Sequence, residues 1–406
     1  MTRKNNMNIL LIGVGYFPWL TSGEKNFFYQ LLPILQEQCG IVVFSLNDYP
    51  EKQISQQTPL GTIPVYCARR ALHRNYEQFF FQGNGYTSYH HRHSPPREIV
   101  EKFTSVVSQL PRLRRIIKYH HIKVIHFMDN FGIAMPFLRM AFPNVKVTYS
   151  AANYDPRSRQ SFYDAYLKIS LGYLHGAGVY THAYLKKLRE LGIKIPCSIT
   201  PWGVPVPQTN LSLSQKEGMR QELGIPQGQI LLLWSGYLQQ IQEHDYYKTI
   251  AVARQVIQQR DDITFLFAFK PETFKPTYAE EAGKHILVQT GLKNFTDVLE
   301  TADLFCSPIS NTHSTVSPPL TWLEAMIRAT PVVTTNIGGV SEVINHQETG
   351  YIAQNYDDLT ETILQNVQKT SLTKVSQQAQ ALAKTQYSIT NSAQHYLHFW
   401  QEIAAI

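Results

Sequence analysis

Residues 320–352, LTWLEAMIRATPVVTTNIGGVSEVINHQETGYI, decide the fold of this chain. The first ten residues have the apolar spacing of a helix, TPVVTTN (330–336) is a short strand, and Gly338–Gly339 marks a turn. A helix that leads into a short apolar strand is part of a strand–helix–strand unit. Such units build parallel sheets that helices cover on both faces.

The same alternation of apolar strands and helical stretches continues on both sides of this segment. It recurs in QILLLWSGYL (229–238) and ITFLFAF (263–269), and nearer the N-terminus in NILLIGVGYF (8–17) and KVIHFMD (123–129). Continuous apolar runs of this kind are typical of strands that are buried on both faces. We therefore predict an α/β chain with two Rossmann-like, doubly wound parallel sheets.

A polar, proline-containing stretch, PVPQTNLSLSQKEG (205–218), separates the two series of strands. We expect it to be the interdomain linker, which divides the chain into domains 1–203 and 204–389. The last segment, 390–406, is amphipathic and aromatic, and we expect it to complete the first domain. Two domains of this type predict a ligand near the carboxyl ends of their strands.

Charge is distributed unevenly between the two predicted domains. Residues 1–203 carry 24 Lys and Arg against 11 Asp and Glu, whereas the rest carries 13 against 19. This basic first half favours an anionic partner, which could be a phospholipid surface, an acidic glycan or a phosphorylated acceptor. No helix-turn-helix, zinc-finger or aromatic sheet motif is present, so no nucleic acid is expected.

Other broad classes are disfavoured by the sequence. No stretch reaches the length of a membrane span, and the first residues lack the pattern of a signal peptide. We therefore expect a cytoplasmic protein. Peripheral contact with the inner face of the membrane is an alternative. The four cysteines are far apart and show no zinc spacing. The motif GVGYFP lacks the third glycine of a dinucleotide fingerprint.

The segment 320–352 resembles the donor-binding signature of retaining glycosyltransferase family 4. The matching positions are Glu324, the step from Thr330 to Val333, the pair Gly338 and Gly339, and Glu342. The resemblance implies the GT-B fold, with two facing Rossmann-like domains. It also implies retaining transfer of a sugar from a nucleotide-activated or other phosphate-activated donor, with that donor as a substrate and no cofactor or metal.

The physical chemistry of these residues fits a donor nucleotide. A carboxylate such as Glu324 can accept two hydrogen bonds from the vicinal hydroxyls of a ribose. Gly338 and Gly339 allow close approach of the backbone, and a helix after them would direct N–H groups at a phosphate. The alternatives are a capping role for Glu324 and an ordinary turn at the glycines. With Leu320 and Glu342, these residues form the predicted donor-binding set.

In the first domain, the resemblance places Gly23 near the donor phosphates, although Ser22 and Gly23 also suit a helix N-cap. His126 and Asp129, at the end of a predicted strand, are the catalytic candidates, and His126 as a hydrogen-bonded core residue is the alternative. Lys270 is a candidate donor-binding cation at the end of another strand.

Four departures from the family pattern affect the expected chemistry. Val316 stands at a usual glutamate, Pro318 and Pro319 replace two N–H donors, and Met128 replaces a histidine. The cationic phosphate clamp is also missing, because Tyr237 stands where the family has an arginine and Gln242 stands where it has a lysine.

A leaving phosphate needs charge stabilisation. The alternatives to transfer from a conventional nucleotide sugar are therefore an unusual phosphate donor or a catalytically silent GT-B protein that binds a nucleotide, a sugar or a partner subunit. The predicted function remains glycosyl transfer to an unidentified acceptor, which could be lipid-linked or a cell-surface glycan precursor.

Overall fold

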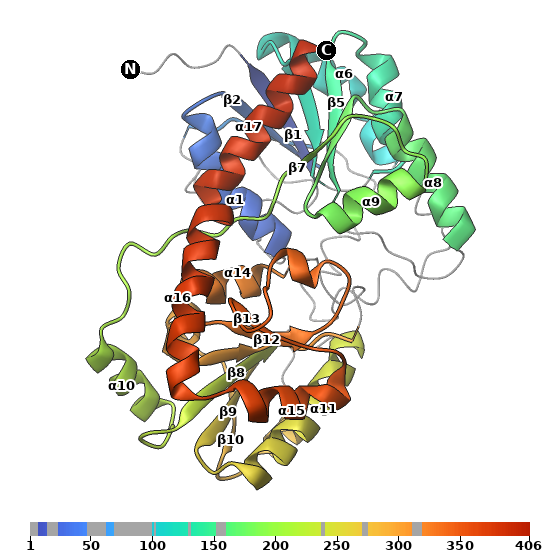
Figure 1. Cartoon of the computed structure of the whole chain (residues 1–406). Coiled ribbons are helices and arrows are strands. Elements are labelled where there is room, and N and C mark those ends of the chain that lie inside the picture. Colours follow the sequence, from blue (N-terminus) through green and yellow to red (C-terminus); the bar gives the residue numbers. More distant parts are fainter. Residues whose placement is uncertain are drawn as a thin grey trace. The chain divides into compact units, whose positions relative to one another are not determined.

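A computed structural model describes residues 7–13, 23–46, 62–68, 100, 103–128, 131–151, 160–236, 240–269, 275–310 and 319–406. The chain divides into two compact units (Figure 1). Unit 1 is Met1–Trp202 together with Ile389–Ile406, and unit 2 is Gly203–Ser388. Each unit is built around one parallel sheet.

The sheet of unit 1 has the strand order β3-β2-β1-β4-β5-β6-β7. Its strands are β1 (Asn8–Gly13), β2 (Gly40–Ser45), β3 (Val65–Cys67), β4 (Val124–Phe127), β5 (Lys146–Ala151), β6 (Gly176–Val179) and β7 (Cys197–Ile199). In the central strand β1, Ile9 pairs with Ile41 on one side and with Val124 on the other. Strands β1, β2 and β4 are almost fully buried, as expected for a sheet covered on both faces.

The helices of unit 1 are α1 (Gly23–Gln36), α6 (Leu110–Tyr119), α7 (Ala134–Ala141), α8 (Gln160–Gly172), α9 (His182–Glu190) and the C-terminal α17 (Ile389–Ala405). Helix α17, at the red end of the chain in Figure 1, packs beside α1 and contacts β6 and β7. The chain therefore returns to unit 1 after it has built unit 2.

A buried polar network joins α17 to the sheet of unit 1. The His126 ring places Nδ1 2.9 Å from Thr148 Oγ1 and Nε2 2.8 Å from Ser150 Oγ. Ser150 Oγ lies 2.8 Å from the hydroxyl of Tyr396 on α17. The ring of Trp400, also on α17, lies 5.2 Å from the His126 ring between centroids. Both ring nitrogens of His126 and the hydroxyls of Ser150 and Tyr396 thus have partners, whereas Trp400 Nε1 is buried without a hydrogen-bond partner among the described residues.

The sheet of unit 2 has the strand order β10-β9-β8-β11-β12-β13. Its strands are β8 (Ile230–Gly236), β9 (Ile263–Phe269), β10 (Ile286–Thr290), β11 (Leu304–Cys306), β12 (Val332–Thr335) and β13 (Gly350–Ala353). Its helices are α10 (Leu213–Glu222), α11 (Gln240–Gln259), α12 (Pro276–Ala279), α13 (Phe295–Thr301), α14 (Leu320–Ile327), the single 3₁₀ turn η2 (Val340–Glu342), α15 (Tyr356–Asn366) and α16 (Lys369–Gln386).

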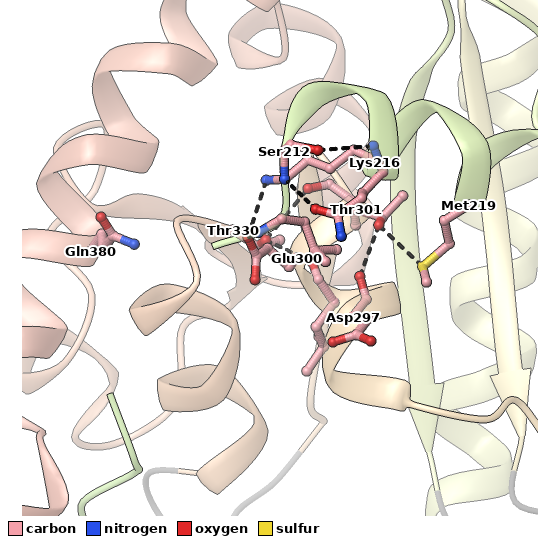
Figure 2. Close-up of polar contacts among 12 residues, drawn as sticks. Ser212, Lys216, Met219, Asp297, Glu300, Thr301, Thr330 and Gln380 are labelled. Atoms are coloured by element: carbon pink, nitrogen blue, oxygen red, sulfur yellow. Dashed lines mark hydrogen bonds and ion pairs between the residues drawn. The ribbon is translucent and has the colours of Figure 1, made fainter. Parts of the chain in front are cut away.

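The polar stretch 205–218, expected as the interdomain linker, lies within unit 2 and is fastened to it at both ends. Val204 N–H donates to the carbonyl of Tyr387 (2.9 Å), and Leu211 N–H donates to Glu300 Oε1 (2.5 Å). Glu300 is almost fully buried, and Lys216 Nζ lies 3.7 Å from its carboxylate (Figure 2). A polar composition did not distinguish this anchored segment from a free linker.

Within the described part of the chain, no helix combines the length and apolar character needed to cross a membrane. Cys39, Cys67 and Cys306 are buried, Cys197 is partly exposed, and all four are free thiols.

The buried His126 predicts a pH-dependent stability of unit 1. Burial lowers the pKa of His126 to about 3 from an ordinary value of 6.5. Below about pH 6.5, His126 binds a proton in the unfolded chain but not in the folded chain. Each unit by which the pH is lowered therefore reduces the free energy of unfolding by up to about 1.4 kcal/mol. Urea denaturation at pH 7.5 and 5.0 should show a smaller loss for His126→Gln than for the parent.

The pKa of His175 is also lowered, to about 4, but this residue is retained in both proteins and contributes equally to both. An equal loss of stability in parent and variant would show that His126 does not carry this pH dependence.

Candidate donor-binding edge of unit 2

The carboxyl ends of the unit 2 strands form one edge of the sheet, because all of its strand pairs are parallel. The strand order reverses between β8 and β11, since β9 follows on one side of β8 and β12 lies beyond β11. In open α/β sheets, ligands bind beyond the carboxyl ends of the strands at this switch point. The segment that follows β11 lies at this switch point and the segment that follows β12 lies next to it, and these two segments form the candidate site.

The segment after β11 is held by several side chains. Trp322 Nε1 on α14 donates to Ser307 Oγ (2.9 Å), and Thr334 Oγ1 donates to the Ser307 carbonyl (2.8 Å). Thr335 Oγ1 accepts from the N–H of Ile309 (2.9 Å). Helix α14 and strand β12 thus fix residues 307–309, which directly follow β11.

Asp245 on α11 completes this frame from the opposite side. Its side chain is almost fully buried, and Oδ1 accepts from Ser310 N–H (3.1 Å) and from the Tyr356 hydroxyl (2.9 Å). Burial and the charge of Asp245 raise the pKa of Tyr356, so its hydroxyl remains a donor. Sequence analysis missed Asp245; the only available signal was a carboxylate two residues after Glu243 in a helix that then becomes apolar.

Glu324 is the fifth of the eight residues of α14. It therefore lies one turn into the helix, which begins after the extended Pro319 (φ −59°, ψ 133°). The surrounding residues Trp322, Leu323, Ala325, Met326 and Ile327 are buried, whereas Glu324 is half-buried. The N–H of Leu320 belongs to the first turn and has no partner within an α-helix. Helix α14 thus presents a carboxylate and first-turn N–H groups on one short element.

The far end of α14 is anchored by neighbouring helices. Gln380 Nε2 on α16 donates to the carbonyl of Ile327 (3.1 Å). Thr330 Oγ1, just beyond α14, donates to the carbonyl of Leu299 on α13 (2.7 Å). Because both ends of α14 are held, the position of Glu324 is set by the core of unit 2.

The glycine pair follows β12 at the same edge of the sheet. Gly339 has φ +87°, a conformation that favours glycine, whereas a Cβ at Gly338 would meet no described atom within 4 Å. Gly338 is therefore not required by packing. The helix expected after the pair is only the 3₁₀ turn η2, so the prediction of a helix there was wrong and little helix dipole is available.

Glu342 is the last residue of this 3₁₀ turn and is half-buried. Its backbone carbonyl accepts a hydrogen bond from the Tyr387 hydroxyl at 2.7 Å. The turn that bears Glu342 is thereby tied to the end of α16.

Gln242, which stands where the family has the lysine of its phosphate clamp, is the third residue of α11. The next residue, Glu243, has a lysine nearby. Lys275 Nζ donates to Glu243 Oε1 (2.6 Å), and the Tyr278 hydroxyl donates to the same oxygen (2.8 Å). The hydrogen bond from Lys275 is the main cause that lowers the pKa of Glu243. The charge of Lys275 is therefore already balanced by Glu243.

The structure places the remaining predicted residues as follows. Gly23 is the first residue of α1 in unit 1. His126 is fully buried and both ring nitrogens have hydroxyl partners, which favours the core interpretation over direct contact with a substrate. Several other positions lie outside the described residues: Asp129, Tyr237, Lys270, Val316 and Pro318.

Among the residues that the structure describes, no group of three or more His, Cys, Asp or Glu side chains is arranged to hold a metal ion.

Part of the sequence matches a known protein family. Residues 229–369 match the family model described as "Glycosyl transferases group 1". This match spans α14, the glycine pair and Glu342. No curated protein matches the sequence.

Solved structures match the whole chain in fold. A glycosyltransferase from Rickettsia africae aligns with a TM-score of 0.72 and 16% identity, over 98% of this chain and 99% of that one. The HepE protein of Anabaena, solved with UDP and glucose, aligns with a TM-score of 0.69 and 13% identity, over 98% and 100%. Sucrose-phosphate synthase from Thermosynechococcus elongatus gives 0.71 and 14%, over the same shares.

The two Rossmann-like units and these alignments define the GT-B fold, which confirms the predicted fold class. The predicted resemblance is confirmed as well: the chain resembles the group 1 glycosyltransferases, and the match to their family model lies within its second unit.

Asp245→Ala should destabilise unit 2, because it removes the buried acceptor of the Ser310 N–H and leaves the Tyr356 hydroxyl with only the Pro308 carbonyl (3.0 Å). The expected loss is about 1–3 kcal/mol in the free energy of unfolding by urea. The matched control is Asp261→Ala, an exposed aspartate of the same unit, which should change stability by less than about 0.5 kcal/mol. Equal stability of the two variants would contradict the frame described above.

Proposed function

We propose that the chain is a retaining glycosyltransferase that binds a nucleotide-activated sugar at the carboxyl edge of unit 2. The observation that carries this proposal is the overlap of the matched segment 229–369 with the described edge. The matched segment and the edge both contain the predicted donor-binding residues Leu320, Glu324, Gly338, Gly339 and Glu342. The HepE structures contain UDP and UDP-glucose, which supports a nucleoside diphosphate sugar as the class of donor.

In this proposal, Glu324 accepts hydrogen bonds from the two ribose hydroxyls of the donor. The first-turn N–H groups of α14, that of Leu320 included, and the backbone at Gly338 and Gly339 face the phosphates. Gly338 fits this role because its surroundings leave room for a ligand atom where a side chain would stand. Glu342 lies beside the glycine pair and completes the donor-binding set.

The transfer step follows from the chemistry of such a donor. The bond between the anomeric carbon and the phosphate oxygen breaks, and a bond from that carbon to an acceptor hydroxyl oxygen forms with retention of configuration. The hydroxyl proton passes to the leaving phosphate. Backbone N–H groups at the edge would stabilise the developing negative charge. No metal or cofactor is required, and His126 stays in the core of unit 1.

A second candidate function is a GT-B protein that binds a nucleotide or sugar without turnover. The specific observation in its favour is the compensated charge of Lys275, beside the place where the family has a cationic clamp. Binding of a nucleoside diphosphate without hydrolysis or transfer of its sugar would select this alternative.

Thermal shift with UDP, GDP and ADP, without metal, tests donor binding, because a ligand that binds only the folded chain raises the melting temperature. We expect one of them to give a concentration-dependent shift. Glu324→Gln should then raise the Kd of that nucleotide roughly tenfold to a hundredfold, since the hydrogen bonds to a charged acceptor are lost.

Glu348→Gln is the matched control, since Glu348 is an exposed glutamate of unit 2. It should bind like the parent. If Glu324→Gln folds and also binds like the parent, the ribose assignment is wrong.

For unit 1, we propose contact with an anionic phospholipid surface, at the inner face of the cytoplasmic membrane, that brings the chain to a lipid-linked acceptor. Residues 103–128 contain no Asp or Glu, and α6 and its C-terminal extension expose Arg114, Arg115, Lys118 and Lys123. Tyr119, 76% exposed, lies among them. Basic side chains with an exposed aromatic ring fit the interface of a bilayer that carries negative charge.

The variant Arg114→Ala/Arg115→Ala/Lys118→Ala should weaken co-sedimentation with vesicles that contain phosphatidylglycerol, because each basic residue near the surface contributes attraction. Vesicles of phosphatidylcholine alone should bind neither protein. The control Lys284→Ala/Lys293→Ala removes two exposed basic residues from unit 2. Binding of the parent to both vesicle types alike, or no effect of the triple variant, would contradict this proposal.

A further inference from the structure

Tyr387 occupies a distinctive place in the chain. It follows the end of α16, and the chain leaves unit 2 one residue later, after Ser388. The other passage between the units is at Trp202–Gly203. Val204 N–H donates to the Tyr387 carbonyl (2.9 Å), and Val204 forms a parallel bridge with Ser388. Within unit 2, the two connections to unit 1 are therefore paired at Tyr387.

The side chain of Tyr387 points to a different feature, the turn that bears Glu342. Its hydroxyl donates to the Glu342 carbonyl at 2.7 Å, and the residue is only 7% exposed. Burial, together with the charge of Glu342, raises the pKa of Tyr387 to about 12. The hydroxyl therefore stays protonated near neutral pH and donates permanently.

The turn is also held locally, because Val340 is buried and its carbonyl accepts from the N–H groups of Val343 (3.0 Å) and Ile344 (2.9 Å). Glu342 N–H donates to the carbonyl of Gly339 at 3.1 Å, and Val340 N–H donates to that of Ile337 at 3.1 Å, both of them local bonds. The hydrogen bond from Tyr387 joins residues that are 45 positions apart. A single 3₁₀ turn is a weak element, so this long-range bond to its last carbonyl ties it to a distant part of unit 2, which the local bonds do not do.

We propose that Tyr387 is a positioning residue of the donor site: its hydroxyl fixes the position of Glu342 and, through it, of the glycine pair. Tyr387 does this from the point in unit 2 where the two connections to unit 1 are hydrogen-bonded to each other. The proposal rests on the proposed function, because it assigns the turn to donor binding. Tyr387 itself does not contact the donor. It acts through the backbone of Glu342.

The test compares Tyr387→Phe with Tyr246→Phe. Both remove one buried hydroxyl from unit 2, and the Tyr246 hydroxyl has no hydrogen-bond partner among the described residues. Amide hydrogen exchange of residues 340–344 should be faster in Tyr387→Phe and unchanged in Tyr246→Phe. The Kd of the nucleoside diphosphate that gives the largest thermal shift among UDP, GDP and ADP should rise roughly fivefold to tenfold in Tyr387→Phe alone.

With the corresponding sugar nucleotide, KM should rise by a similar factor while kcat changes little, a split that loss of stability alone does not produce. Unchanged donor Kd in a folded Tyr387→Phe variant overturns the inference, even where exchange becomes faster, because Tyr387 is then only structural. If the parent binds none of the nucleotides, the proposed function fails, and the exchange measurement still reports whether Tyr387 holds the turn.

Discussion

Burial of both faces of a parallel sheet is the constraint on which the rest of this structure depends. Helices must cover each face, so polar ligands can reach the sheet only at the ends of its strands. In unit 2, this brings the segments after β11 and β12 to one edge, although they are separated in sequence by α14. The candidate site follows from this arrangement, because Glu324 and the glycine pair are carried by those two neighbouring segments.

Long-range polar contacts then give the edge a defined shape. Asp245 and Trp322 hold the segment after β11 from α11 and α14, while Gln380 holds the end of α14 itself. Each of these side chains bonds to a backbone or hydroxyl group of a segment distant in sequence, so together they fix the edge from three helices. Among the described residues of unit 2, Asp245 and Glu300 are the buried carboxylates, and both bond to backbone groups of the unit.

The sequence was sufficient for the two sheets, because strand burial is a local pattern. The donor-binding residues that it indicates through the motif of residues 320–352 stay a prediction. It was insufficient where the outcome depended on contacts between distant residues. The buried partners of His126 come from β5, and Tyr387 meets Glu342 across 45 positions. Likewise, the 3₁₀ turn after Gly339 and the anchoring of residues 205–218 depend on packing that no local pattern records.

The most direct measurement of the central claim is a crystal structure of the protein with the nucleoside diphosphate that it binds best. The account predicts ribose hydroxyls within hydrogen-bond distance of the Glu324 carboxylate and phosphates beside Gly338 and Gly339. A nucleotide bound elsewhere on the chain, with Glu324 in contact only with protein or solvent, would contradict it.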